Sequence, residues 1–286
     1  MKPLISVIIP THGRPQMLAE ALVSVRSQTY SDFEIIVVSN GANSEARSLT
    51  RSFARSHDAR YFELHTGNLS IARNFGIEQA HGDWIAFLDD DDLWLPQKLE
   101  QQVSEAARTG ADLIACNHLE VYPDGRVIVA CRPRLPDGWT YTKALSYHYC
   151  GPLPSGTMVR KAAIKAVGGF DPRLRFCPDW DILRRISWRH SIHVMDEVLV
   201  LYRVGHLAIS HPQNDRRRRI HELKHFAKMW LDTPRDLRSE LPRAATFVPE
   251  RLVRALAPGW LLGFLHRLQP RTRLNRFRYR LRNLRS

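Results

Sequence analysis

Two almost wholly apolar runs near the N-terminus limit the folds that this chain can adopt. Residues 4–9 and 34–38 are each long enough for one strand, and neither alternates polar with apolar side chains. Such strands are typical of a parallel sheet that is covered on both faces. Between them, apolar residues recur at helical spacing from Leu18 to Val25, and Pro15 suits a first helical turn. A strand, a helix and a strand in this order predict a right-handed parallel crossover.

This alternation continues to about residue 108, and the pattern then changes to mixed strands and short helices. We expect one domain over residues 1–210, with halves at 1–110 and 111–210, and an extension over residues 211–286. The fold class predicted is α/β, with a mostly parallel central sheet, a mixed second half and a basic helical C-terminal extension. Further helices are predicted at 44–56, 69–80 and 96–108, before Gly168 and from Asp179, and strands at 60–64, 84–88, 112–122, 126–129 and 156–159, with a strand pair within 192–202.

Residues 89–92 are four consecutive aspartates, at the point where the predicted strand 84–88 leaves the sheet. Along an extended chain, Asp89 and Asp91 share one side, and Asp90 and Asp92 share the other. Either pair could bind one cation, and carboxylate oxygens suit Mg²⁺ or Mn²⁺. The alternative is an acidic, solvated turn. Because apolar residues flank the run on both sides, its position is fixed, which favours the metal site.

Two other polar stretches follow predicted strands in the same way. Thr11-His12 comes after the first strand and Ser39-Asn40 after the second. In open α/β sheets, ligands bind beyond the carboxyl ends of the strands. We therefore expect these two stretches and the four aspartates to form one pocket.

The net charge of the chain points to an anionic partner. Its 286 residues carry a formal charge of +13, although 44% hydrophobic and 25% charged residues are ordinary for a soluble globular protein. Nucleotide phosphates, an anionic membrane surface and nucleic acid all fit this charge. The sequence has no signal-peptide pattern, no run of about 18 apolar residues, and no metal-binding spacing of its four cysteines. We expect a cytoplasmic protein, attached at most to the inner face of the cytoplasmic membrane.

The last part of the chain suggests how it could attach to a membrane. Leu274, Phe277, Leu281 and Leu284 recur at three- and four-residue spacing, and arginines occupy much of the remainder. This pattern favours an interfacial helix on anionic lipid. A disordered basic tail and a helix packed on the body are the alternatives.

Several segments in order resemble the family 2 glycosyltransferases, which are inverting enzymes that use nucleotide sugars. The resemblance runs from about residue 4 to residue 202 and implies the Rossmann-like GT-A fold, with a nucleotide half and an acceptor half. The segments that carry it are the opening strand and loop at 6–15, the stretch 27–38, the Ala-Arg-Asn helix at 69–77, the Asp-x-Asp run at 89–92, and residues 168–171 leading to Asp179.

The resemblance also implies a metal and donor site. Asp89 and Asp91 match the outer members of Asp-x-Asp, with Asp91 the direct ligand of a Mn²⁺ or Mg²⁺ ion between the donor's phosphates. Pro10, His12 and Asn40 match base-binding positions, and Arg73 lies near the phosphates. The implied donor-binding residues are Pro10, Thr11, His12, Arg14, Asn40, Arg73 and Asp90.

Two of these positions depart from the family's pattern. Asn40 stands where the family usually has a carboxylate that accepts from uracil N3–H. Its amide carbonyl can accept the same bond, while its amino group can serve another base. His12 replaces the usual tyrosine and could stack on the base, or be a loop histidine without a role. A UDP-sugar is the donor that these residues favour.

The segment after Gly169 resembles the part of the family that carries the catalytic base. Asp179 matches that aspartate, although Pro178 stands where a glutamate usually precedes it. A general base typically contributes ~10²–10⁴-fold to the rate. The alternative is that Asp179 or Asp181 caps a helix. Arg203 and His206 resemble the family's closing loop, where a basic side chain reaches the diphosphate, but Gly205 disturbs the spacing.

We therefore expect a metal-dependent inverting glycosyltransferase. It would move a sugar from a nucleotide to the hydroxyl of a glycan or lipid-linked acceptor, in cell-surface polysaccharide or glycolipid biosynthesis. One alternative is a non-catalytic nucleotide-sugar binding module, but Asp89, Asp91 and Asp179 are all present. The other is a nucleic-acid-binding protein, which is disfavoured because the arginines concentrate in a tail rather than in a recognisable module.

Overall fold

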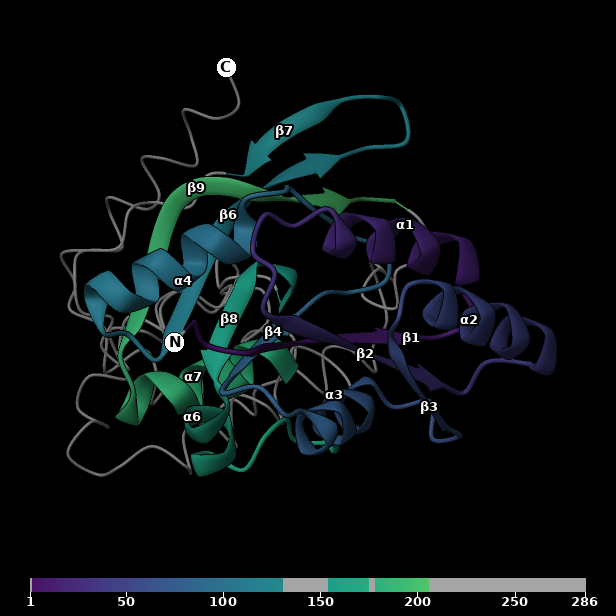
Figure 1. Cartoon of the computed structure of the whole chain (residues 1–286), viewed down its shortest axis with the longest axis horizontal. Coiled ribbons are helices and arrows are strands. Elements are labelled where there is room, and N and C mark those ends of the chain that lie inside the picture. The colour runs from purple at the N-terminus through teal and green to yellow at the C-terminus, as the bar shows by residue number, and fades with distance from the viewer. Residues whose placement is uncertain (1, 131–153, 175–177, 206–286) are drawn as a thin grey trace, which may run out of the picture. The chain divides into compact units, whose positions relative to one another are not determined.

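The computed structural model describes residues 2–130, 154–174 and 178–205 (Figure 1). Its first half alternates strands with helices, as the apolar runs predict. Every strand-forming run up to residue 88 is found within two residues of its expected bounds at each end. The elements are β1 (Ile5–Thr11), α1 (Pro15–Arg26), β2 (Phe33–Asn40), α2 (Ser44–Ser56), β3 (Arg60–Leu64), α3 (Leu69–Gln79) and β4 (Trp84–Phe87).

These four strands form a parallel array in the order β3-β2-β1-β4. Val7 of β1 pairs with Ile35 of β2 on one side and with Ala86 of β4 on the other. All three side chains are buried. The register sets the carboxyl ends of β1, β2 and β4 at one edge of the sheet, where ligands bind in folds of this kind.

The second half extends the same sheet with strands of mixed direction. Strand β8 runs antiparallel to both β4 and β6, and β9 runs parallel to β6. Among the described residues, nine strands form one sheet in the order β3-β2-β1-β4-β8-β6-β9-β5, with β7 paired to β6. The elements are β5 (Leu93–Trp94), α4 (Lys98–Thr109), β6 (Leu113–Val121), β7 (Val127–Ala130), the 3₁₀ turn η1 (Pro154–Gly156), β8 (Thr157–Arg160), α6 (Lys161–Ala166), α7 (Pro178–Arg189) and β9 (Ile192–Arg203).

Two features of this half differ from the sequence prediction. The strand pair expected within residues 192–202 is wrong, because β9 is one continuous strand that pairs with β6 and also, near its end, with β5. Strand β5 itself, only two residues long, was not predicted. The local pattern contains no turn signal that would distinguish one long strand with two neighbours from two short strands.

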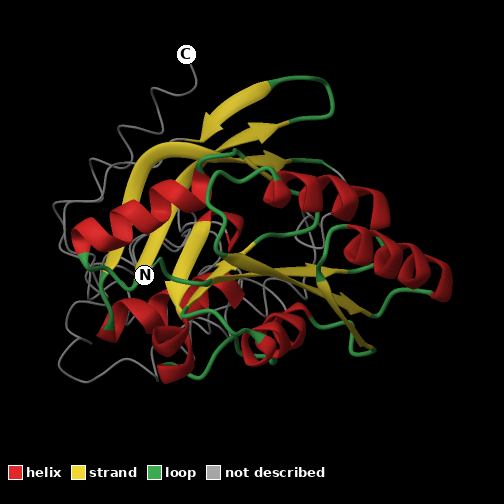
Figure 2. Cartoon of the chain, viewed as in Figure 1, coloured by secondary structure: helices red, strands yellow, loops and turns green. Residues whose placement is uncertain are grey.

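Helices cover both faces of the sheet (Figure 2). Successive side chains of β1 point to opposite faces, so Val7 and Ile8 belong to different cores. Val7 lies in the core that α1, α2 and α4 cover with Leu22, Ala54 and Leu99. Ile8 lies in the core that α3, α6 and α7 cover with Ile77, Ile164 and Ile182. Burial on both faces explains why these strands read as continuous apolar runs.

Several predictions lie outside the described residues. They concern the extension over residues 211–286 with its proposed interfacial helix, the domain boundary at residue 210, His206, and three of the cysteines. Within the described residues, no helix is both long enough and apolar enough to cross a membrane.

Candidate active site

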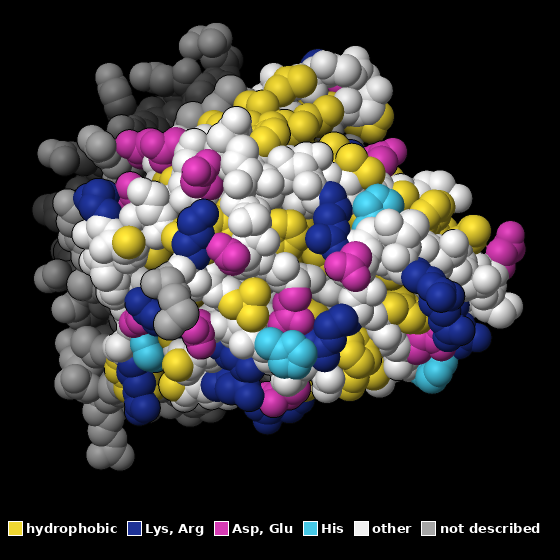
Figure 3. Space-filling model, in the orientation of Figure 1, with side chains coloured by type: hydrophobic (Ala, Val, Ile, Leu, Met, Phe, Trp, Pro, Cys, Tyr) yellow, Lys and Arg dark blue, Asp and Glu magenta, His cyan; other side chains and the backbone are white. Residues whose placement is uncertain are grey.

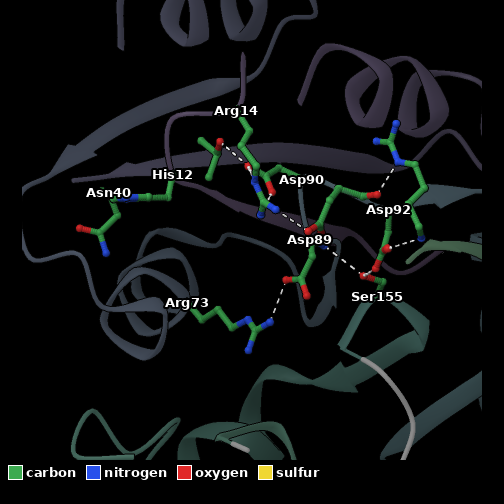
Figure 4. A network of polar contacts seen from close by, with 11 residues as sticks. His12, Arg14, Asn40, Arg73, Asp89, Asp90, Asp92 and Ser155 are labelled. Carbon is green, nitrogen blue, oxygen red and sulfur yellow. Dashed lines mark hydrogen bonds and ion pairs between the residues drawn. The ribbon is translucent and has the colours of Figure 1, made fainter. Parts of the chain in front are cut away.

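The four aspartates form a tight turn directly beyond β4, at the edge where β1 and β2 also end (Figure 4). The backbone N–H of Asp92 donates to the carbonyl oxygen of Asp89 over 3.0 Å, which closes the turn. The chain is therefore not extended here, and the expected alternation of side chains does not hold. Oxygen atoms of Asp89, Asp91 and Asp92 all lie within 4.8 Å of one another. The turn thus brings three carboxylates together, and Asp92 joins Asp89 and Asp91, the pair that the family resemblance implies.

Asp90 points away from this cluster. Its carboxylate accepts a hydrogen bond from the Thr11 hydroxyl at 2.6 Å and forms an ion pair with Arg14. Burial raises the pKa of Asp90 to about 6, although the Arg14 charge acts in the opposite direction. The predicted donor-binding residues Thr11 and Asp90 therefore contact each other and support the turn.

Arg14 lies over the turn at the start of α1. One arm of its guanidinium contacts Asp90, and the other contacts the Asp91 carboxylate at 2.5 Å. Burial would by itself disfavour the charge, but the two carboxylates outweigh it and raise the pKa of Arg14. In this arrangement Arg14 compensates part of the negative charge that a metal ion would otherwise compensate.

Asp92 is fixed by a residue from the other half of the domain. The Ser155 hydroxyl in η1 donates to Asp92 at 2.5 Å and accepts from the backbone N–H of Asp89 at 3.1 Å. Burial and the charges of Asp89 and Asp91 hold the pKa of Asp92 well above its usual range. A divalent cation would favour the ionised form of such a carboxylate. Three hard oxygen ligands in this geometry fit Mg²⁺ or Mn²⁺.

Sequence reasoning did not identify Ser155 or the part that Asp92 takes in the cluster. Ser155 lies in no recognisable motif, so no sequence signal could have identified it. Arg203, at the end of β9, is a further contact: its Nε donates to the Asp91 carbonyl oxygen at 2.5 Å, and its backbone N–H to Asp92 at 3.4 Å. Its Nη2 has no partner among the described residues.

Arg73 joins the turn to Asp179. Its guanidinium is almost wholly buried, contacts Asp89 at 2.8 Å with one arm, and forms an ion pair with Asp179 with the other. The Phe170 ring lies 5.2 Å below the guanidinium. Arg73 comes from α3 and Asp179 from the first turn of α7, so two distant segments meet here. The predicted base thus lies one side chain away from the carboxylate cluster.

Asp179 and Asp181 differ in their surroundings. Asp181 is fully buried and pairs with Arg184 at 3.1 Å and Arg185 at 2.7 Å, which makes it a structural residue of α7. The side chain of Asp179 keeps about a third of its surface exposed (33%). Desolvation raises the pKa of Asp179, while the Arg73 charge lowers it. Of the two, only Asp179 combines exposure with proximity to the cluster.

Asn40, the last residue of β2, holds a neighbouring loop. Its Oδ1 accepts from the backbone N–H groups of Thr66 and Gly67, both at 3.0 Å, and from the Thr66 hydroxyl at 3.1 Å. Its Nδ2 donates to the Asn68 carbonyl oxygen at 2.8 Å. The side-chain carbonyl of Asn40, which was predicted to accept a hydrogen bond from the nucleotide base, thus already accepts from three donors of residues 66–67.

Replacing Asn40 by alanine should lower the free energy of unfolding by about 0.5–1.5 kcal/mol, because the backbone N–H groups of Thr66 and Gly67, which lie on an exposed loop, would lose the acceptor that holds them. Urea denaturation measures this change. Asn40→Asp keeps an acceptor oxygen for both N–H groups and should lose less. Equal stability of Asn40→Ala and the wild type would show that Asn40 does not hold the loop.

His12 lies beside Asn40, beyond the end of β1. Its Nδ1 is 2.5 Å from the Asn40 carbonyl oxygen, so Nδ1 carries the proton and Nε2 is an acceptor in the neutral ring. The ring rests against Gly41, which has φ +82°, and a Cβ there would approach His12 Cε1 to 3.0 Å. Pro10, also predicted, is buried within β1. His12 is thus the exposed polar group at this end of the site.

Comparison with known proteins agrees with this fold. The sequence profile of "Glycosyl transferase family 2" matches residues 6–168. A glycosyltransferase of Rickettsia felis is 39% identical over 201 residues, which cover 70% of this chain and 33% of that protein. Glycosyltransferase AglE of Haloferax volcanii is 38% identical over 127 residues, covering 43% of this chain and 42% of that protein. The chain therefore belongs to glycosyl transferase family 2.

Solved structures show the same GT-A fold. Staphylococcus aureus TarS residues 1–349 in complex with UDP-GlcNAc superposes with a TM-score of 0.63 at 18% identity, covering 88% of this chain and 83% of that chain. The mannosyltransferase PcManGT of Pyrobaculum calidifontis, in complex with GDP-Man and Mn²⁺, also superposes with a TM-score of 0.63. The identity is 19%, and the match covers 94% of this chain and 74% of that chain. This chain spans only part of the length of some relatives. The matched region covers 70% of a glycosyltransferase of Rickettsia typhi, 41% of EpsJ of Bacillus subtilis and 33% of a glycosyltransferase of Rickettsia conorii.

Proposed function

We propose that this chain transfers a glycosyl group from a nucleoside diphosphate sugar to an acceptor hydroxyl, with inversion at the anomeric carbon. A UDP-sugar is the donor that we favour, and a glycan or lipid-linked molecule is the acceptor. The observation that supports this most is the contact of the Arg73 guanidinium with both Asp89 and Asp179. It brings a carboxylate cluster suited to a metal-bound diphosphate next to a carboxylate suited to a base.

In this proposal, Asp89, Asp91 and Asp92 hold Mn²⁺ or Mg²⁺. When bound, the cation supplies Lewis-acid stabilisation of the departing diphosphate. The chain's own residues set the geometry: Ser155 orients Asp92, and Thr11 and Arg14 support the turn through Asp90.

Asp179 is the proposed general base. Its carboxylate takes the proton of the acceptor hydroxyl while that oxygen attacks the anomeric carbon. The new carbon–oxygen bond forms as the bond from the anomeric carbon to the phosphate oxygen breaks, and the nucleoside diphosphate leaves with that electron pair. Arg73 orients Asp179 and favours its ionised form, which is the form that can accept a proton.

For recognition of the base, we propose His12 in place of Asn40. The Asn40 carbonyl is engaged by loop residues, whereas the exposed His12 ring has its Nδ1 tied to the backbone. Its Nε2 can accept a hydrogen bond from N3–H of uracil or N1–H of guanine. Adenine N1 and cytosine N3 are acceptors themselves, so these bases could donate to Nε2 only through their exocyclic amino groups, in a shifted position. Pro10 contributes to the floor of this subsite.

Release of nucleoside diphosphate from UDP-, GDP-, ADP- and CDP-sugars, with Mn²⁺ or Mg²⁺, tests the proposal. We expect turnover of a UDP-sugar that EDTA abolishes, and slower turnover of ADP- and CDP-sugars, whose ring nitrogens cannot donate to Nε2. His12→Phe keeps a stacking ring but removes the acceptor, so KM for the UDP-sugar should rise about tenfold. Tight binding of a donor without turnover, even with acceptor extracts, would favour a binding module; binding of no donor would refute the proposed function.

The two alternatives are not favoured. The described part of the chain retains the full set of candidate metal ligands and the candidate base, which a binding module would not need. On the face seen in Figure 3, basic side chains alternate with acidic ones and form no continuous basic stripe of the kind nucleic acid requires. Attachment to anionic lipid through residues 211–286 remains a prediction from the sequence, based on its arginines and on the spacing of its apolar residues.

A further inference from the structure

A lysine is buried directly behind the carboxylate turn. Lys98, the first residue of α4, has no exposed surface (0%). Lysine is rarely buried unless its charge is compensated. Here Nζ donates to Gln102 Oε1 at 2.9 Å and lies 3.7 Å from the centre of the Trp94 ring. Lys98 forms no ion pair with any carboxylate of the described residues, so an aromatic face and an amide oxygen compensate its charge.

Both partners of Lys98 hold the 3₁₀ turn η1. Trp94 Nε1 donates to the Ser155 carbonyl oxygen at 2.7 Å, and Gln102 Nε2 donates to the Gly156 carbonyl oxygen at 2.9 Å. The two side chains that contact the ammonium group therefore donate hydrogen bonds to two consecutive carbonyl oxygens of η1. All of these atoms are buried, so the geometry is protected from exchange with water.

The other side of η1 faces the candidate metal cluster. The Ser155 hydroxyl donates to Asp92 and accepts from the backbone N–H of Asp89. Trp94 also follows Asp92 by two residues, so it anchors the end of the acidic turn through β5. An unbroken series of contacts thus leads from Lys98 through Trp94 and Ser155 to the carboxylate of Asp92 and to the backbone N–H of Asp89.

We propose that Lys98 is a positioning residue for the metal site: it fixes Trp94 and Gln102, and through them it sets the spacing of Asp89 and Asp92. This inference rests on the proposed metal-dependent function. Sequence reasoning placed Lys98 in the helix predicted at 96–108 and assigned it no role. Burial also lowers the pKa of the ammonium group to about 8, as expected for a cation held without a counter-charge.

The sign of the effect distinguishes positioning from simple electrostatics. Lys98→Met removes a positive charge near a cation site, and if charge alone mattered, the affinity for Mn²⁺ would increase. If Lys98 positions the ligands, the affinity should instead fall about tenfold, the lower end of the range for residues that orient metal ligands. Titration of Mn²⁺, followed by the electron paramagnetic resonance of the free ion, measures affinity without any donor or turnover.

Trp94→Phe provides a second variant that does not depend on Lys98→Met folding. It keeps an aromatic face for the ammonium group but removes the N–H that holds Ser155, and it should weaken Mn²⁺ binding similarly. Lys161→Met is a matched control, because Lys161 donates to the Ala80 carbonyl oxygen next to the amino end of β4, away from the site. Its Mn²⁺ affinity should equal that of the wild type.

We also expect the KM for Mn²⁺ to rise in Lys98→Met, with a smaller change in kcat at saturating metal. Unchanged or tighter Mn²⁺ binding in both Lys98→Met and Trp94→Phe would overturn the role of Lys98 and leave the proposed function intact. A wild-type protein that binds no Mn²⁺ would refute the metal site itself, and this inference with it.

Discussion

Asp179→Asn should lower kcat about 10²–10⁴-fold, the range over which a positioned general base contributes. The amide retains an oxygen that can accept from Arg73, so the buried guanidinium keeps a hydrogen-bond partner. We therefore expect the donor KM and the melting temperature to change little. Asp112→Asn is a suitable control, because Asp112 is a partly exposed carboxylate paired with Arg160, at the end of the sheet opposite the site.

The dependence of the rate on pH gives a second measurement for this variant. Burial raises the pKa of Asp179, so the wild-type kcat/KM should fall as the pH drops through a value above the usual range of aspartate. Only the ionised form accepts a proton, which fixes the sign: activity is present above this pKa and lost below it. At saturating Mn²⁺, which keeps the ligand carboxylates ionised, the acid limb should disappear in the residual activity of Asp179→Asn. A variant with nearly wild-type turnover would exclude Asp179 as the base.

Asp91→Ala should abolish binding of Mn²⁺ at concentrations that saturate the wild type, and should lower metal-dependent turnover about 10²–10³-fold. Lewis-acid stabilisation of a leaving diphosphate is worth several kcal/mol, and the variant would lose it. Each loss of about 1.36 kcal/mol lowers the rate about tenfold. Without metal, the stability of the variant should change little, because the substitution removes both the repulsion of Asp91 by Asp89 and Asp92 and its ion pair with Arg14.

Thermal melting with and without Mn²⁺ separates these effects. The wild type should melt at a higher temperature when Mn²⁺ is added, since a ligand that binds only the folded state stabilises it. Asp91→Ala should lose this shift. Asp83→Ala is the matched control, because Asp83 is exposed and precedes β4 at its other end. Retention of the full Mn²⁺ shift in Asp91→Ala would exclude Asp91 as a ligand.

The sequence determined the parallel half of the fold and the edge at which the site lies. Strands buried on both faces must be apolar throughout, and the helices between them must show one apolar stripe, so both patterns are local and readable. Because strands that alternate with helices run parallel, their order in the sequence also predicts that β1, β2 and β4 end at the same edge of the sheet. The resemblance to the family added the positions of Asp89, Asp91 and Asp179, whose combined arrangement no single segment reveals.

Only the tertiary structure decided which atoms meet at the site. The turn at residues 89–92 cancels the alternation of an extended chain and brings Asp92 to Asp89 and Asp91. Ser155 reaches Asp92 across 63 positions of sequence, and Arg73 reaches Asp179 across 106. Contacts at such separations depend on how the layers pack, because local propensity acts only over a few residues. For the same reason the sequence identified the acidic site, while the packing of Lys98, Trp94 and η1 behind it emerged only from the fold.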